Sequence, residues 1–138
     1  MRSKKGYKIL VVDDEKAIVD VIRTNLEYEG YDVVTAYDGL EALEKVDQEK
    51  PDLVILDIMM PKLDGYEVLQ ALRGQPETQD IPVIVLTAYP SDVGAMAAFR
   101  HDVDSYLSKP FQPEEMLSLV ERILSEEESS HSEGDDEP

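Results

Sequence analysis

The sequence contains no cysteine and no tryptophan, and it has no long apolar run. The absence of cysteine excludes disulfides, thiolate metal sites and cysteine nucleophiles. No segment approaches the roughly 20 consecutive apolar residues that a membrane-spanning helix needs. The N-terminus is basic, but Asp13 and Asp14 interrupt the apolar run that follows it, which argues against a signal peptide. Together these absences indicate a cytoplasmic protein with no membrane segment.

Basic residues are also scarce, with 13 Lys and Arg against 31 Asp and Glu and a net charge of -18. So acidic a chain is not expected to bind nucleic acid directly. Seven of the acids lie in residues 125–138, which contain no Lys, no Arg and no apolar side chain. Because this segment has nothing to bury, we expect a disordered acidic tail or the stub of a linker.

Residues 1–124 suit a single domain, within which two apolar patterns alternate. Short β-branched runs predict strands at 8–12, 32–36, 53–56, 83–86 and 105–107. Helical spacing between them predicts five helices, whose apolar stripes include Ile22, Leu43, Leu69, Ala98 and Val120. Five strands, each followed by a helix, predict an α/β fold built on a doubly wound parallel sheet.

Polar residues collect where these predicted strands end. Asp13 and Asp14 follow the first strand, and Asp57, Thr87 and Lys109 stand at the ends of the third, fourth and fifth. Taken singly, each has an ordinary structural explanation as a helix cap, a turn residue or a solvated surface charge. In open α/β sheets, however, functional groups gather beyond the carboxyl ends of the strands. Their joint placement therefore favours one functional site.

The chemistry of this set suggests a phosphoryl-transfer site. Carboxylates packed closely together require a cation, and an oxygen-only donor set suits Mg²⁺ or Ca²⁺ rather than zinc. One carboxylate can then act as a nucleophile and form an aspartyl phosphate, for which Asp57 is the strongest candidate. The metal and Lys109 would neutralise the transferring oxygens, while the Thr87 hydroxyl donates to one of them.

Four motifs give the chain a family resemblance. They are 11–15 (VVDDE), 57–65 (DIMMPKLDG), 86–88 (LTA) and 106–111 (YLSKPF). In this order they resemble the receiver domain of two-component response regulators, over about residues 7 to 124. The resemblance implies a (βα)5 flavodoxin-like sheet with strand order 2-1-3-4-5, the order found in the chemotaxis member of that family. It also implies a signalling module rather than an enzyme.

Residue by residue, the resemblance implies a phosphorylation site that uses Mg²⁺. Asp57 would be the phosphoacceptor, charged by a histidine kinase or a histidine phosphotransfer protein. Asp14 would be the main metal ligand, Asp13 would bind the ion through water, and Met59 would offer its backbone carbonyl. Lys109 would pair with the phosphoryl group, and a cis peptide bond is expected before the following proline.

The resemblance further implies a switch that reports phosphorylation. Thr87 would move towards the phosphate, and the Tyr106 ring would turn inward. The output surface would comprise the fourth helix, the fifth strand and the fifth helix, a region that Gly94 would make pliable. Its target would be a downstream protein or an output domain, and a phosphorylation-dependent dimer is left open.

Two positions depart from the family pattern. Asp102 stands before the fifth strand where most relatives have glycine, and aspartate tolerates a left-handed backbone better than most residues. Tyr89 lies two residues after Thr87, where the family tunes the access of hydrolytic water. We expect its bulk to lengthen the lifetime of the phosphoryl group.

Three other functions compete with the receiver interpretation. A haloacid-dehalogenase-like phosphatase needs a second acid two residues after its nucleophile, where this chain has Met59. A flavodoxin-like cofactor carrier would place a Gly, Ser or Thr-rich loop after strand one, and the acids at 13–15 would repel a phosphate there. A degenerate receiver that only docks is the third alternative, which the intact site residues disfavour.

Overall fold

The computed structural model describes residues 6–60, 64–88 and 103–136, without side chains beyond residue 127. The strands are β1 (Lys8–Val12), β2 (Asp32–Ala36), β3 (Leu53–Asp57), β4 (Val83–Thr87) and β5 (Ser105–Ser108). The helices are α1 (Lys16–Tyr28), α2 (Gly39–Glu49), α3 (Gly65–Arg73) and α5 (Pro113–Asp136). All five predicted strands are confirmed, and four of the five predicted helices. The predicted helix around Ala98 lies outside the described residues, as do Tyr89, Gly94 and Asp102.

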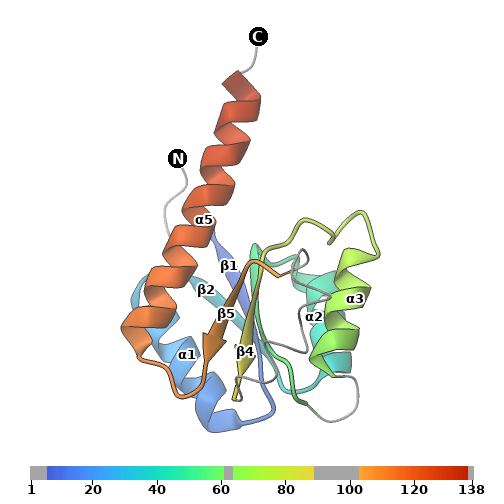
Figure 1. Ribbon diagram of the computed structural model, residues 1–138, viewed down its shortest axis with the longest axis vertical. Coiled ribbons are helices and arrows are strands. Elements are labelled where there is room, and N and C mark those ends of the chain that lie inside the picture. Colours follow the sequence, from blue (N-terminus) through green and yellow to red (C-terminus); the bar gives the residue numbers. More distant parts are fainter. Residues whose placement is uncertain (1–5, 61–63, 89–102, 137–138) are drawn as a thin grey trace.

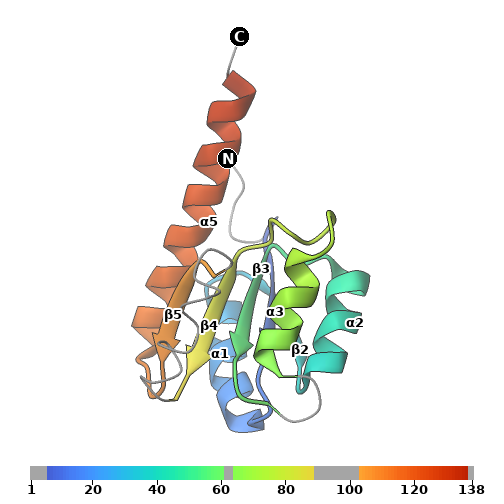
Figure 2. The same cartoon turned by 45° about the vertical axis from the view of Figure 1, so that its right-hand side comes forward.

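The five strands form one parallel sheet in the order β2-β1-β3-β4-β5, which confirms the expected order (Figure 1). Side chains along each strand point alternately to the two faces. Ile9 and Val11 join one apolar cluster, whereas Leu10 and Val12 join the other. Helices α1 and α5 cover the first face, and α2 and α3 cover the second (Figure 2). Burial on both faces explains why β1, β3 and β4 are apolar almost throughout.

The register of the sheet brings the strand ends to one edge. Val12 of β1 pairs with Leu56 of β3, so the residues that follow them lie side by side. Asp57 pairs with Leu86 of β4, and Thr87 pairs with Ser108 of β5. The carboxyl ends of four strands therefore deliver their polar residues to the same end of the molecule.

Helix α5 continues further than expected. A disordered acidic tail or the stub of a linker was expected at residues 125–138, within which α5 extends to Asp136 and projects beyond the sheet (Figure 1). Buried Met116, Val120 and Ile123 hold the first turns against the sheet. A helix that has already formed is extended at little cost, and no proline occurs between Pro113 and Pro138. Among the described helices, none combines the length and the apolar character needed to cross a bilayer.

Candidate functional site

Three carboxylates meet at the carboxyl edge of the sheet. Asp13 and Asp14 follow β1, Asp57 ends β3, and one oxygen from each lies within 4.8 Å of the others. Asp13 is fully buried and Asp57 is 4% exposed, whereas Asp14 lies open to solvent. The sheet register thus brings together the three acids that the sequence singled out.

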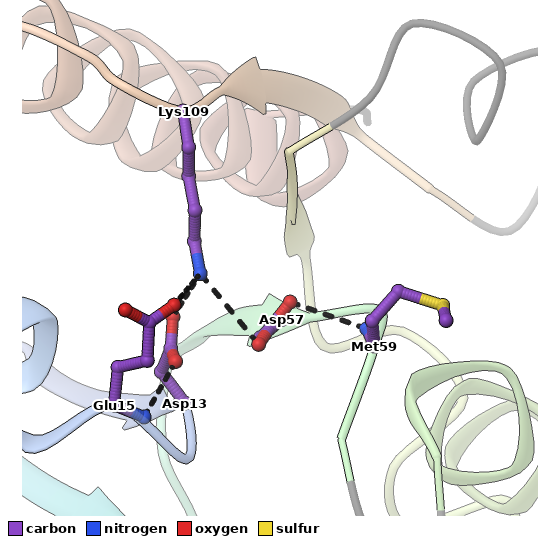
Figure 3. Close-up of polar contacts among 5 residues, drawn as sticks. All are labelled: Asp13, Glu15, Asp57, Met59 and Lys109. Atoms are coloured by element: carbon purple, nitrogen blue, oxygen red, sulfur yellow. Dashed lines mark hydrogen bonds and ion pairs between the residues drawn. The ribbon is translucent and has the colours of Figure 1, made fainter.

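Lys109 supplies the positive charge of this group (Figure 3). Its Nζ lies 2.7 Å from Asp13 Oδ2 and 3.6 Å from Asp57 Oδ2. The lysine follows β5, and its backbone amide donates to the Thr87 carbonyl at 2.8 Å, which fixes the start of the side chain. The expected cis bond between Lys109 and Pro110 is confirmed. One ammonium thus faces two buried carboxylates, and the net charge of the group is negative.

Backbone amides orient both buried acids in the same way. The Glu15 amide donates to Asp13 Oδ1 at 2.9 Å, and the Met59 amide donates to Asp57 Oδ1 at 3.2 Å (Figure 3). Each carboxylate therefore keeps one oxygen on its own loop and turns the other towards Lys109. Asp13 Oδ2 is fully buried and, apart from its ion pair with Lys109, has no hydrogen bond to any described residue.

The surroundings shift the protonation of two of these groups. Burial, followed by the charge of Asp13, raises the pKa of Asp57 from 3.8 to about 7, although Lys109 and the Met59 amide lower it. Burial lowers the pKa of the Lys109 ammonium, but the hydrogen bond to Asp13 and the neighbouring carboxylate charges outweigh it, and the net shift is upward. The geometry thus combines a permanently charged lysine with a carboxylate that is costly to ionise.

Glu15 is the residue whose contact the sequence did not reveal. It is the residue before α1, but its side chain makes no capping hydrogen bond. Its Oε1 lies 3.4 Å from Lys109 Nζ instead. The only signal in the sequence was its place as the third acid of a run, because the partner lies far away along the chain.

The expected switch residues lie beside this group on β4 and β5. Thr87 is 1% exposed at the end of β4. Tyr106 pairs with Val85 across the sheet, and its partly buried side chain packs against the cluster under α2 and α3. Met59 exposes 59% of its surface, and only its backbone faces the acids.

A close backbone contact holds the loop that follows Asp57. The Gly65 amide donates to the Ile58 carbonyl at 3.1 Å, and Asp64 begins α3 with a capping box that includes Glu67. A Cβ atom on Gly65 would lie 2.6 Å from both the Asp57 carbonyl oxygen and the Ile58 Cα. No side chain fits at this position, because the obstacles are backbone atoms.

We therefore expect Gly65→Ala to destabilise the protein by about 1–2 kcal/mol, since the loop must move to relieve the overlap. Gly74→Ala is the matched control, because the overlap there is smaller. Its Cβ would lie 3.2 Å from the Gln70 carbonyl oxygen, at the exposed end of α3. Urea unfolding measures both free energies. Equal stabilities for the two variants would contradict the proposed constraint.

Known proteins with similar sequences are response regulators. Residues 9–121 match the family described as response regulator receiver domain. The alkaline phosphatase synthesis transcriptional regulatory protein PhoP of Bacillus subtilis is 49% identical over 117 residues, which are 85% of this chain and 48% of that protein. Response regulator MprA of Mycobacterium tuberculosis is 44% identical over 119 residues, or 86% of this chain and 51% of that protein. The chain thus spans about half the length of these curated relatives.

Solved structures with a similar fold are also response regulators. The chemotaxis response regulator CheY4 of Vibrio cholerae superposes with a TM-score of 0.79 and is 34% identical, covering 85% of this chain and 98% of that one. A response regulator from Chloroflexus aurantiacus, described as putative, gives a TM-score of 0.79 at 34% identity, over 86% of this chain and 98% of its own.

Proposed function

The chain belongs to the response regulator receiver family, and on that basis we propose that it is a phosphoacceptor switch of a two-component system. Asp57 accepts the phosphoryl group from a histidine kinase or a histidine phosphotransfer protein. The observation that carries the proposal is the position of its carboxylate, at the end of a buried strand and 3.6 Å from Lys109 Nζ. A signalling module, rather than an enzyme acting on a separate substrate, fits this arrangement.

The residues present suit a bound Mg²⁺ ion. Carboxylate oxygens from Asp13, Asp14 and Asp57 lie within 4.8 Å of one another, and the buried Asp13 Oδ2 has Lys109 Nζ as its only polar contact among the described residues. These three acids and the Met59 carbonyl would hold the ion, with Asp13 acting through water. When bound, Mg²⁺ supplies positive charge that offsets the acids and the incoming phosphoryl oxygens.

The chain's own residues then position the transfer. An Asp57 carboxylate oxygen attacks phosphorus, a P–O bond forms, and the P–N bond to the donor histidine breaks. The imidazole leaves with the bonding electron pair. Lys109 is held over the acids and pairs with a phosphoryl oxygen, and the Thr87 hydroxyl at the end of β4 donates to another.

Phosphorylation would reach the surface through Thr87 and Tyr106. Thr87 moves towards the phosphoryl group, and the half-buried Tyr106 ring turns into the space that it leaves. The altered surface includes β5 and α5 and binds a downstream protein or an output domain, or forms a phosphorylation-dependent dimer. We propose that residues 1–124 form the receiver domain. We also propose that the protein acts in the cytoplasm.

We expected that this chain does not bind nucleic acid directly, and its relatives do not support that expectation. PhoP is named as a transcriptional regulatory protein, and a second relative, RpaA of Synechocystis, is named as a DNA-binding transcriptional regulator. This chain covers 48% of each. We therefore propose only that the receiver itself acts through protein contacts, and that any DNA contact belongs to an output domain.

Incubation with acetyl phosphate and Mg²⁺, followed by intact-mass measurement, tests the proposed function. We expect one added phosphoryl group in the wild type and none in Asp57→Asn. Asp14→Ala should require more Mg²⁺ for the same yield, because it removes a metal ligand. An unmodified wild type in the presence of Mg²⁺ would favour the docking module, and an adduct that persists in Asp57→Asn would exclude Asp57 as the acceptor.

A further inference from the structure

A cavity lies at the opposite end of the sheet from the acids. It has a volume of about 600 Å³ and is lined by side chains from the C-terminal halves of α2 and α3 and from the loop 74–82. Figure 2 shows these two helices side by side. Leu43, Val46, Leu72 and Ile81 supply apolar surface to it. Cavities that hold small organic ligands have volumes of roughly 300–1,000 Å³ and similarly apolar walls. The size and lining therefore suit a small organic molecule.

Hydrogen bonds hold the wall of this cavity in place. The Arg73 guanidinium donates to the carbonyls of Gln79 at 3.0 Å and of Ile81 at 2.7 Å. The Thr78 hydroxyl donates to the Leu72 carbonyl at 2.5 Å, which ties the loop to α3. The loop is thus anchored at several points, and a ligand would find the cavity largely formed.

The charges around the cavity favour a cation. Asp47, Lys50 and Glu77 line it, and the side chain of each has no ion pair or hydrogen bond with another described residue. Helix α2 ends here without a basic residue in its last turn, so its C-terminal carbonyls add partial negative charge. The Arg73 guanidinium in the wall is paired with Asp104 at 3.6 Å, so two acids and this helix end face only the lysine, which is unpaired among the described residues. The net charge of -18 also attracts cations to the molecule.

We propose that this cavity binds an organic cation, an ammonium group carried on an apolar body. The ammonium group lies against the carboxylates of Asp47 and Glu77, and the apolar body packs on Leu43, Val46 and Ile81. This inference goes beyond the proposed phosphoacceptor function and does not depend on it.

Titration of the ¹⁵N-labelled protein with three phenyl compounds of similar size tests the charge that the cavity prefers. The compounds are phenethylamine, neutral 2-phenylethanol and anionic 3-phenylpropanoate. We expect phenethylamine to shift the amides of the non-proline residues in 43–51 and 71–81 saturably and to leave those of 105–109 unchanged. The alcohol and the carboxylate should bind at least about fivefold more weakly. Equal affinity for amine and alcohol, or no saturable shift with the amine, would overturn the proposal.

Variants locate the binding. The double variant Asp47→Asn/Glu77→Gln should weaken phenethylamine binding by about fivefold. Glu44→Gln/Glu114→Gln changes the net charge by the same amount outside the cavity and should not weaken it. Ala71→Phe should fill the cavity and abolish binding, with folding checked by circular dichroism. If the control double variant bound phenethylamine as weakly as the cavity double variant, the effect would be non-specific electrostatic attraction. That result would overturn the proposed site.

One further variant separates this proposal from the phosphoacceptor function. Asp57→Asn cannot be phosphorylated if that function is right, but its cavity is intact, so it should bind phenethylamine as the wild type does. Loss of binding in Asp57→Asn would place the amine at the acidic site and overturn the cavity assignment. Failure of the acetyl phosphate experiment alone leaves the expected amine titration unchanged.

Discussion

Asp57→Asn is expected to stabilise the metal-free protein by about 3 kcal/mol at pH 8, even though it removes the proposed phosphoacceptor. The pKa of this carboxyl is raised from 3.8 to about 7, chiefly by burial and by the charge of Asp13. The folded state therefore keeps its proton across a range of pH in which the unfolded state has released it. The stability that Asp57 contributes is fully present below pH 3.8 and is lost as the pH rises through about 7.

Urea unfolding in EDTA at pH 5 and pH 8 measures this effect. The gain in Asp57→Asn over the wild type should be larger at pH 8, because only the wild type must bury an ionised carboxylate there. Asp32→Asn, which removes an exposed carboxylate from β2, should follow the wild type at both pH values. Mg²⁺ should reduce the stability difference between Asp57→Asn and the wild type, since a ligand that binds the folded wild type stabilises that state. A gain that does not depend on pH would refute the electrostatic explanation.

Lys109→Met is expected to have the opposite effect and to cost about 3 kcal/mol at pH 8 without metal. Its Nζ lies 2.7 Å from buried Asp13 and 3.6 Å from Asp57, and its side chain is only 12% exposed. Methionine fills much of the same space but leaves two buried carboxylates without a cation. Removing one partner of a buried ion pair is costly because the remaining charge is uncompensated.

A double-mutant cycle with Asp57→Asn tests the origin of this loss. The second substitution should recover a substantial part of the stability, because it removes one of the carboxylates that Lys109 offsets. Lys16→Met removes an exposed lysine at the start of α1 and should change the stability by less than about 0.5 kcal/mol. Additive effects of the two site substitutions would mean that Lys109 acts through packing rather than charge.

The two predictions describe one trade-off. The folded protein holds more negative charge at this edge than its single lysine offsets, and that excess lowers its stability. The same excess of negative charge would attract a divalent cation, whose charge would in turn offset an incoming phosphoryl group. A site assembled for stability alone would place an asparagine or an apolar residue at position 57.

The strands, most of the helices and the residues at the strand ends can be predicted from the sequence, because these features are local. Alternating and helical apolar spacing reports which side of an element is buried, and a strand that ends on Asp57 must present it at the edge of the sheet. The motifs then supplied the strand order through the family resemblance, which the observed sheet confirms.

The sharing of charge at that edge, in contrast, could be learned only from the folded structure. The contact between Glu15 and Lys109 and the raised pKa of Asp57 depend on distances between residues far apart in the sequence and on burial from both faces of the sheet. The cavity between α2 and α3 likewise requires the loop 74–82 to be in place. No pattern along the chain encodes these quantities, because each is a sum over neighbours that only folding assembles.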